Sequence, residues 1–416
     1  MSSNVALEGL KVVDFGWVAA DPQVSRQLSY HGAVVVRVEC HRALDTLRVC
    51  PPYKENKPHV NGSGFFAAYN VNKYGMSVDL TKPAAKEVAR RLVAWADVLT
   101  EGMTPGALKN HYLDYESCRA INPGIIYLST STFGQQGPYR AAAGYGLYAA
   151  GYAGFSHILG WPDRGPLYSY NYLTDFIAPQ FGVVAVLGAL RRRRRTGEGT
   201  YIDLSQVESG LYALGVSLLD YRVNGNVAGR LGNRDPWMAP HGVYPCRGKN
   251  RYVALAVASE VQWDSLCRLI AAPWCTEGRF ATLALRKQHE DELDEMLADW
   301  TSQFTAEQAM ERLAGAGISA AVVETCEDLF QDPQLKAREH FQRLRHSEIG
   351  EHAYHSPAYR LSRTPHRFIK ASPCLGEDNE YIYREILGYT DEEISELLIA
   401  GVITTDADLG VIRQVR

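Results

Sequence analysis

The sequence contains eight cysteines in 416 residues, yet none of them forms a C-x-x-C pair. They stand apart along the chain, at Cys40, Cys50, Cys118, Cys246, Cys267, Cys275, Cys326 and Cys374. This spacing is typical of neither a zinc site nor a disulfide framework. We therefore expect free, mostly buried thiols and no bound metal.

Long apolar runs and a strong charge of one sign are also missing. The most apolar stretch, residues 176–190, is about 15 residues long, short of the ~20 that a membrane-spanning helix needs. No basic segment followed by an apolar run opens the chain, as a secretory signal would. The formal net charge of -4 does not indicate a nucleic-acid partner. We expect a cytoplasmic protein that binds neither membranes nor nucleic acids, with enough length for two domains.

Several familiar catalytic and binding motifs are absent. No G-x-G-x-x-G follows the first predicted strand, no G-x-x-x-x-G-K-[ST] occurs, and no G-x-S-x-G elbow is present. The HAYH segment at 352–355 has no third ligand nearby, which favours surface residues over a metal site. The arginine run at 191–195 ends a predicted helix, where cations stabilise the helix dipole, although a nuclear signal or an anion site has the same composition.

The first half of the chain alternates short apolar segments with helical ones. Strands rich in β-branched residues are predicted at 10–15, 33–39, 75–80, 97–102, 124–131 and 197–205. Between two of them, residues 83–96 place Val88, Leu92 and Trp95 on one helical face. This βαβ pattern predicts an α/β fold with a parallel sheet covered by helices. Near residue 226 the pattern changes, because residues 241–257 predict an antiparallel hairpin and helices follow, which indicates a second, smaller α+β domain.

Asp175 is the one carboxylate in an otherwise apolar and aromatic stretch, residues 165–190. The residues that follow it predict a helix buried on nearly every side. Asp175 stands where this helix begins, so its side chain can act as an N-cap. The same position also suits a carboxylate kept ionised in a water-poor site, as a nucleophile requires. The local sequence is compatible with both roles.

A series of segments in the chain resembles the signatures of one enzyme family. These are LEGLKVVDFGWVAADPQVSRQLSYHGAVVVRVE, DTLR (45–48), NVNKYGMSVDL (70–80), NPGIIYLSTSTFGQQGPYR (122–140), Asp175, RRRTGEGTYIDLS and LGEDNEYI (375–382). In this order they resemble the family III CoA-transferases, the CaiB/BaiF group. The resemblance implies a Rossmann-like large domain formed by residues 1–225 and a returning C-terminal segment, 346–416, with the small domain at 226–345. It also implies two chains interlocked like rings, as a homodimer or as a heterodimer with a paralogous subunit.

In that family the residue matching Asp175 is the nucleophile, which forms aspartyl anhydride and aspartyl-CoA thioester intermediates. The resemblance also implies residues that bind coenzyme A, as an acyl-CoA substrate. These are Arg37, Arg48, Asn72, Lys73, Met103, Gln135, Gln136 and Gly137. Each of the charged ones can equally be a solvated surface residue, and FGQQGP can be an ordinary turn.

The sequence also departs from the family pattern. GMTPG (102–106) stands where N-F-R-P-G is usual, Asp21 replaces a glycine, and Gly146 replaces an acidic residue. A carboxylate at position 21 that points inward would repel coenzyme A. An inactive structural subunit of a hetero-oligomeric CoA-transferase is therefore the alternative. A racemase is less favoured, because residues 139–156 contain no histidine and the first one is His157.

The acids that are exchanged are only weakly indicated. The chain has 24 tyrosines, and those around Asp175 are Tyr145, Tyr148, Tyr152, Tyr168, Tyr170 and Tyr172. They predict a large aromatic-lined pocket, although core packing accounts for many such rings equally well. Resemblance to members that use succinyl-CoA, including benzylsuccinate CoA-transferases, suggests a dicarboxylic or aromatic acceptor acid.

Overall fold

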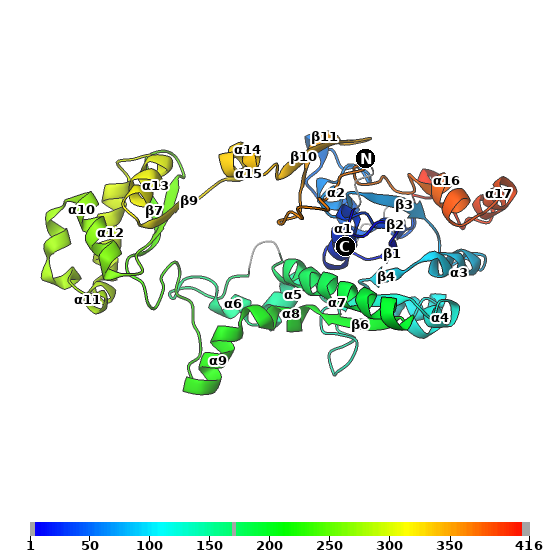
Figure 1. Cartoon of the computed structure of the whole chain (residues 1–416), viewed down its shortest axis with the longest axis horizontal. Helices are drawn as coiled ribbons and strands as arrows, with labels where there is room; N and C mark the ends of the chain where they lie inside the picture. Colours follow the sequence, from blue (N-terminus) through cyan, green and yellow to red (C-terminus); the bar gives the residue numbers. More distant parts are fainter. Residues whose placement is uncertain (1–4, 169–171, 410–416) are drawn as a thin grey trace. The chain divides into compact units, whose positions relative to one another are not determined.

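The chain forms two compact units, each described here by itself (Figure 1). The computed structural model describes residues 5–168 and 172–409. The first unit consists of residues 1–156, 168–227 and 336–416, and the second of residues 157–167 and 228–335. The boundaries expected after residues 225 and 345 stay predictions.

A six-stranded sheet forms the centre of the first unit, in the order β3-β2-β1-β4-β5-β6. The strands are β1 Lys11–Phe15, β2 Val34–Glu39, β3 Lys73–Ser77, β4 Val98–Glu101, β5 Ile126–Ser131 and β6 Thr200–Ser205. All neighbouring pairs are parallel, which confirms the predicted parallel sheet. The strand order reverses between β1 and β4, and open α/β sheets bind ligands at such a switch point, outside the carboxyl ends of the strands.

Helices connect and flank the strands of both units. The α-helices of the first unit are α1 Ala20–Tyr30, α2 Gly64–Asn70, α3 Ala85–Trp95, α4 Tyr115–Ile121, α5 Gly146–Tyr152, α7 Thr174–Thr196, α8 Gln206–Ala213, α9 Gly215–Asn224, α16 Asn379–Tyr381 and α17 Asp391–Ile399. The remaining α-helices are α6 Phe155–Ile158, α10 Glu260–Ile270, α11 Leu283–Gln288, α12 Glu290–Thr301, α13 Ala306–Gly315, α14 Cys326–Gln331 and α15 Pro333–Ala337. Short 3-10 or π turns lie at Thr46–Val49, Lys54–Asn56, Ala107–His111, Pro273–Thr276, Gly278–Phe280, Ile382–Ile386 and Asp406–Asp408.

Both faces of the parallel sheet are covered, because successive side chains of a strand point to opposite faces. On one face, Val12 of β1 belongs to a core cluster with Val24 of α1 and Val186 of α7. On the other face, the neighbouring Val13 clusters with Leu92 of α3 and Ile382 of the C-terminal segment. Apolar residues on both sides explain why the strands read as nearly continuous β-branched runs.

The C-terminal segment lies against the edge strand β3. The Gly75 N–H donates to Asp378 Oδ2 (2.7 Å), and the Asp378 N–H donates to the Gly75 carbonyl (2.9 Å). The Ser77 N–H donates to Asn379 Oδ1 (2.8 Å), and the Tyr383 hydroxyl donates to the Ser77 carbonyl (3.0 Å). Residues 378–383 therefore bind the sheet edge through both backbone and side-chain hydrogen bonds.

The second unit contains a three-stranded antiparallel sheet, in the order β7-β8-β9. Its strands are β7 His241–Pro245, β8 Tyr252–Ala256 and β9 Ser319–Val322, and a separate antiparallel pair in the first unit is β10 Phe341–His346 with β11 Gly350–His355. Strands β7 and β8 form the hairpin predicted from residues 241–257. Trp263, Leu297 and Leu313 share one core with Val253 of β8.

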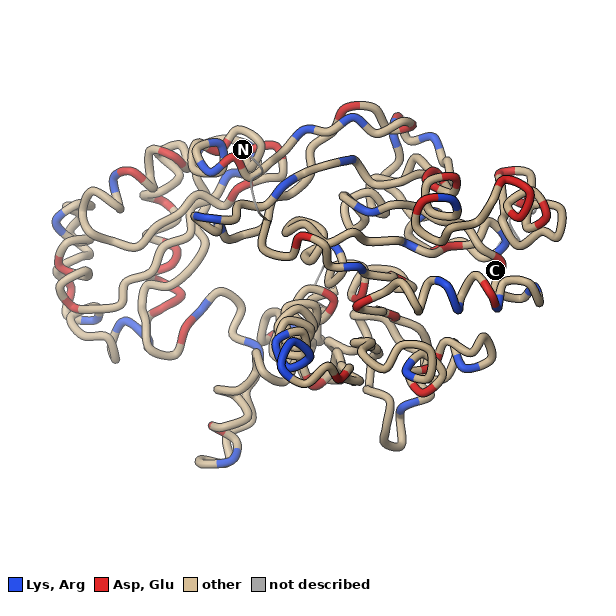
Figure 2. Tube along the Cα trace, turned by 45° about the vertical axis from the view of Figure 1, so that its right-hand side comes forward, with Lys and Arg blue, Asp and Glu red and all other residues tan. Residues whose placement is uncertain are grey.

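Helix α7 differs from its sequence-based description as a helix buried on nearly every side. In the single chain, Val184 is 69% exposed, Leu187 41% and Phe176 39%. The prediction was wrong for these residues because only one side of α7 packs on the sheet. The arginine run lies at the carboxyl end of this helix (Figure 2). There Arg193 pairs with Asp97 (2.8 Å), which fixes the helix end to the start of β4.

Other sequence-based expectations concern thiols and membranes. All eight cysteines are free, as expected, but only Cys118 and Cys246 are buried, so the expectation of mostly buried thiols was wrong. Within residues 5–168 and 172–409, no helix is both long and apolar enough to cross a membrane.

We predict that Gly75→Ala destabilises the first unit by about 1–3 kcal/mol, the range for overpacking a filled site. A Cβ atom on residue 75 would lie 2.7 Å from Pro373 Cβ and 2.8 Å from the Cys374 carbonyl oxygen. The free energy of unfolding, measured by urea denaturation, tests this. Gly315→Ala is the control, since a Cβ there meets no atom within 4 Å. Equal stability of both variants would contradict the packing of the C-terminal segment on β3.

Candidate active site

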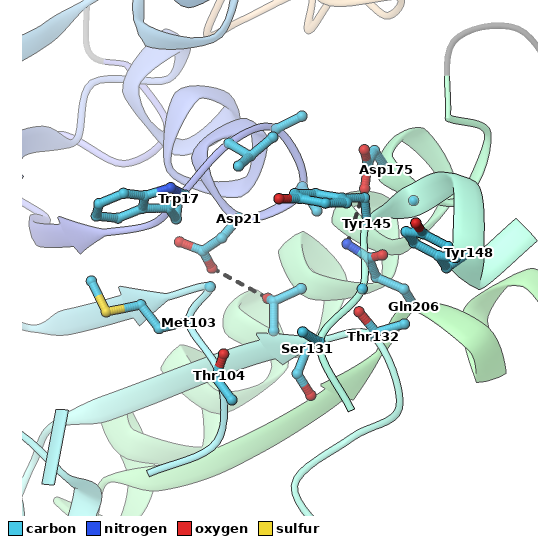
Figure 3. A pocket seen from close by; sticks show the side chains of 18 of the residues that line it. Trp17, Asp21, Met103, Thr104, Ser131, Thr132, Tyr145, Tyr148, Asp175 and Gln206 are labelled. Atoms are coloured by element: carbon cyan, nitrogen blue, oxygen red, sulfur yellow. Dashed lines mark hydrogen bonds between the residues drawn. The ribbon is translucent and has the colours of Figure 1, made fainter. Parts of the chain in front are cut away.

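A cavity of about 550 Å³ opens at the switch point of the parallel sheet (Figure 3). Its walls come from the segments that follow β1, β4 and β5, and from the start of α5. The residues that line it include Trp17, Asp21, Met103, Thr104, Thr130, Ser131, Thr132, Tyr145, Gly146, Tyr148, Asp175 and Gln206. Two carboxylic acids, Asp21 and Asp175, therefore share one cavity with aromatic rings and hydroxyl groups.

Asp175 lies in the first turn of α7, where its side chain is 6% exposed. Gln206 Nε2 donates a hydrogen bond to Asp175 Oδ1 (3.0 Å), and Gln23 Nε2 donates to the Asp175 backbone carbonyl (2.7 Å). The N-cap of α7 is Leu173, without a side-chain cap, so the N-cap interpretation of Asp175 was wrong. The carboxyl group points into the cavity, toward Gln206, instead of back onto its own helix (Figure 3).

Burial governs the ionisation of Asp175. Removal from water raises the pKa of its carboxyl to about 7, while the hydrogen bond from Gln206 lowers it. A carboxyl with this pKa exists in both forms near neutral pH. Its ionised form is a stronger nucleophile than an exposed aspartate, because it is more basic and less hydrated.

Gly146 makes room for the Asp175 carboxyl. A Cβ atom on residue 146 would lie 2.5 Å from Asp175 Cγ and 2.6 Å from each carboxyl oxygen. The Thr174 hydroxyl also donates to the Gly146 carbonyl (2.9 Å), which joins α5 to the start of α7. The departure from an acidic residue at this position therefore has a steric basis, since in this arrangement any side chain would displace the carboxyl.

Arg37 and Lys73 lie in the interior and do not line the cavity. Lys73 Nζ bonds to Asp14 Oδ2 (2.7 Å), and Arg37 bonds to Asp14 Oδ1 (3.1 Å) and Asp45 Oδ2 (2.6 Å). Both cations are 1% exposed or less. Their charges are neutralised by carboxylates of their own chain, which is what buried ions require.

Arg48 and Asn72 also bond within the chain. Arg48 forms two hydrogen bonds with Glu39 (2.8 and 2.7 Å) and lies over the Phe66 ring. Asn72 Oδ1 accepts the Ile369 N–H (2.8 Å), so this residue holds the returning C-terminal segment. Neither lines the cavity.

The FGQQGP loop and the GMTPG loop contribute differently. Gln135 Nε2 donates to Ser129 Oγ (2.6 Å), whereas Gln136 and Gly137 are exposed, and none of the three lines the cavity. Met103 does line it, and its N–H donates to Glu101 Oε2 (2.9 Å). The structure thus brings Met103 and Asp175 together and leaves the other predicted residues outside the cavity wall.

Some cavity residues were missed by sequence reasoning. Gln206 follows β6, and Thr130 lies in β5, so the rule that sites gather at the carboxyl ends of parallel strands could have indicated both. Among the tyrosines, Tyr145 and Tyr148 line the cavity, while Tyr170 lies outside the described residues. No group of three or more His, Cys, Asp or Glu in the described part of the chain could hold a metal ion.

Comparison with known proteins gives consistent results. The model of the CoA-transferase family III matches residues 7–379. Succinyl-CoA–D-citramalate CoA-transferase of Chloroflexus aurantiacus is 30% identical over 398 residues, covering 95% of this chain and 98% of that protein. The beta subunit of succinyl-CoA–L-malate CoA-transferase from the same organism is 28% identical over 407 residues, covering 97% and 99%.

A solved structure has the same fold. The crystal structure of a CaiB/BaiF family protein from Brucella suis matches with a TM-score of 0.84 and 31% sequence identity, over 92% of this chain and 100% of that one. The family model, the relatives and the fold agree along nearly the whole chain. The chain belongs to the CoA-transferase family III, and it is an enzyme of the type that uses CoA thioesters as substrates.

Proposed function

We propose that this enzyme transfers coenzyme A from an acyl-CoA donor to a free carboxylic acid by covalent catalysis at Asp175. The observation that carries the proposal is the placement of Asp175, a nearly buried carboxyl that still lines the cavity at the switch point. Gln206 bonds to Oδ1, and in the described part of the chain no hydrogen bond reaches Oδ2. Oδ2 is therefore the oxygen that attacks.

The proposed reaction consists of two exchanges. Asp175 attacks the carbonyl carbon of the donor thioester, the C–S bond breaks, and an acyl-aspartyl anhydride and CoA thiolate form. The thiolate attacks the aspartyl carbonyl, which releases the donor acid and leaves an aspartyl-CoA thioester. The acceptor carboxylate then attacks this thioester, the C–S bond breaks, and a second anhydride and CoA thiolate form. Finally the thiolate attacks the acceptor carbonyl, so the new acyl-CoA leaves and Asp175 is a carboxylate again.

The surroundings of Asp175 support this chemistry. Every intermediate is an activated acyl group, so no nucleotide is needed, in keeping with the missing phosphate-binding loops. Gln206 Nε2 is an N–H donor next to the reacting carboxyl, where it would stabilise negative charge on the oxygen of a tetrahedral intermediate. Low exposure at the site limits hydrolysis of the anhydride.

For substrates, we propose succinyl-CoA as donor and a dicarboxylic acid as acceptor. The two curated relatives described above are named for succinyl-CoA together with citramalate or malate, which are both dicarboxylic acids. Hydroxyl groups at Thr130, Ser131 and Thr132 offer hydrogen bonds to such an acid. Trp17 and Tyr145 would suit an aromatic group, so an aromatic diacid such as benzylsuccinate remains a further prediction.

For coenzyme A, Met103 is the predicted contact that the cavity geometry favours. Contacts of the CoA phosphates with Arg37, Arg48, Asn72, Lys73 and residues 135–137 stay predictions. The internal bonds of the first four favour a structural role in this chain, since recruiting them for a phosphate would break buried ion pairs or backbone contacts.

We also propose a dimer, interlocked as the resemblance implies. Large apolar side chains on α7, α8 and α9 are exposed in the single chain, and they include Val184, Tyr212, Val216, Leu219 and Val223. Exposed apolar groups of this number are typical of a subunit interface. The partner is a second copy or a paralogous subunit, and one relative is itself named a beta subunit. In the second case a structural role without turnover is the alternative function.

Trapping of the acyl-enzyme tests the proposal directly. Incubation with succinyl-CoA and hydroxylamine should convert Asp175 to a hydroxamate, because hydroxylamine captures aspartyl anhydrides and thioesters. Mass spectrometry of the peptide that contains residue 175 should detect the adduct, and Asp175→Asn should carry none and lose turnover. If the protein binds coenzyme A but the peptide that contains residue 175 carries no hydroxamate, the structural-subunit alternative would be favoured.

The pH dependence should follow the ionisation of Asp175. Because only the carboxylate attacks, kcat/KM is expected to rise with pH through about 7. Gln206→Leu removes the hydrogen bond that lowers this pKa, so the midpoint should move to higher pH. Gln180→Leu, on the exposed side of α7, is the control and should leave the midpoint unchanged. An unchanged midpoint in Gln206→Leu would mean that the pH profile of kcat/KM does not report the ionisation of Asp175.

Gly146→Ala should reduce turnover by about 100-fold, the cost of misplacing a catalytic group by roughly 1 Å. The added methyl group occupies the space of the Asp175 carboxyl. Gly151→Ala, in the same helix, is the matched control, since its Cβ would meet Ser156 Oγ at an ordinary 3.7 Å. Steady-state kinetics on both variants decides, and equal activities would show that the contact between residues 146 and 175 does not matter.

A further inference from the structure

Asp21 is a second carboxyl group in the cavity, and the proposed mechanism does not use it. It lies in the first turn of α1, close to the ends of both β1 and β4, and its side chain is 1% exposed. Glycines clear the space around it, because a Cβ on Gly16 would lie 2.4 Å from Asp21 Oδ2 and one on Gly102 would lie 3.0 Å from Asp21 Cβ. The chain thus accommodates a buried acid at the switch point.

The hydrogen bonds of Asp21 are incomplete. Its Oδ1 lies 3.2 Å from Thr130 Oγ1, which also lines the cavity. Its Oδ2 is buried and forms no hydrogen bond of 3.5 Å or less in the described part of the chain, although the nearby Thr100 hydroxyl acts on the carboxyl. A buried polar atom without a partner is costly, and in native proteins a water, an ion, local strain or a functional role accounts for it.

The number of O–H groups in the Asp21–Thr130 pair decides what the pair can bind. When Asp21 is protonated, the pair holds two O–H groups, and the internal hydrogen bond uses one of them. One donor then remains for a ligand oxygen. When Asp21 is ionised, the single O–H of Thr130 is used internally, and only acceptor atoms remain, which repel an anion.

We propose that Asp21 and Thr130 form a neutral hydrogen-bond donor pair that binds an anionic oxygen of the substrate. The inference rests on the proposed function, because it assigns a substrate-binding role in the same cavity. The anionic oxygen belongs to the remote carboxylate of a dicarboxylic acid or to a phosphate of coenzyme A. This arrangement also resolves the expected repulsion at position 21, since a protonated Asp21 carries no charge.

The groups around Asp21 favour its neutral form. Burial raises its pKa well above the usual value, and the negative charges of Asp14 on β1 and Glu101 on β4 raise it further. The Thr100 hydroxyl and Lys73 on β3 act in the opposite direction. These effects favour the protonated form of Asp21, which has the spare donor, and ionisation of Asp21 at higher pH would remove that donor.

The test uses three variants, Asp21→Leu, Asp21→Asn and Thr130→Val, with thermal unfolding as the check that each is folded. Asp21→Leu and Thr130→Val remove an O–H, so binding should weaken by about 10-fold to 100-fold, as expected for a lost hydrogen bond to a charged group. The effect should appear in KM or Kd, with kcat changed less. Asp21→Asn keeps N–H donors, so it should bind almost as the wild type does at pH 7. Its binding should not weaken at high pH, because an amide side chain does not ionise.

Two measurements distinguish the sources of the oxygen. If the carboxylate is bound, Asp21→Leu should reduce the preference for succinate over butyrate as acceptor. If a phosphate is bound, Asp21→Leu should instead lower the affinity for free coenzyme A, measured by calorimetry. A folded Asp21→Leu enzyme that changes neither quantity, or Asp21→Asn behaving like Asp21→Leu, would overturn the proposal.

The test of the Asp21–Thr130 pair does not depend on whether Asp175 is the nucleophile. Asp175→Asn should lose turnover but still bind free coenzyme A, and full turnover in that variant would overturn the proposed function. Binding of free coenzyme A to the Asp21 variants does not depend on turnover, so failure of the donor pair and failure of the nucleophile give different results.

Discussion

The buried carboxylate of Asp14 is the constraint on which the switch point depends. At the end of β1 it accepts hydrogen bonds from the Gly16 N–H, the Ser25 hydroxyl and Lys73 Nζ, each at 2.7 Å, and from Arg37 at 3.1 Å. These donors belong to the loop after β1, to α1, to β3 and to β2. Loss of the carboxylate would remove the ion-pair partner of Lys73 and leave Arg37 with Asp45 alone. Breaking a buried ion pair in this way typically costs about 3–5 kcal/mol.

This cluster sets the geometry of the cavity. It holds the turn after β1, so Trp17 in that turn and Asp21 at the start of α1 both reach the cavity wall between β1 and β4. In this cluster Asp14 neutralises the positive charges of Lys73 and Arg37 inside the protein. Recognition of an anionic substrate in this cavity then falls to neutral donors, and hydroxyl, amide and protonated carboxyl groups supply them. Asp175 enters from α7, where burial and a single amide donor give it a pKa near neutrality.

Much of the fold follows from local patterns in the sequence. Runs of β-branched residues mark the strands, because a parallel sheet covered on both faces needs apolar side chains at nearly every position. The antiparallel hairpin of the second unit is also visible, since a Gly-Lys-Asn turn separates two β-rich segments. Asp175 stands out because it interrupts an apolar run. The resemblance to the family then identifies it as a candidate nucleophile.

The partners of buried charges could not be predicted in the same way. Arg37 and Lys73 belong to family motifs, yet their contacts depend on Asp14, which lies 23 and 59 residues away in the sequence. The environment of Asp21 depends on four strands, β1, β3, β4 and β5, which only folding brings together. The exposed side of α7 was missed because its apolar residues are the same types that fill a core, and hydrophobicity alone does not tell a core from an interface.

The most direct test of the account is to follow oxygen from the acceptor acid into Asp175. In the proposed mechanism, the bridging oxygen of the second anhydride comes from the acceptor and stays on the aspartate when the new acyl-CoA leaves. Turnover with an acceptor whose carboxylates carry 18O should therefore increase the mass of the peptide containing Asp175, as read by mass spectrometry. An unlabelled peptide after many turnovers would mean that the acids exchange coenzyme A without a covalent bond to Asp175, which would contradict the central claim.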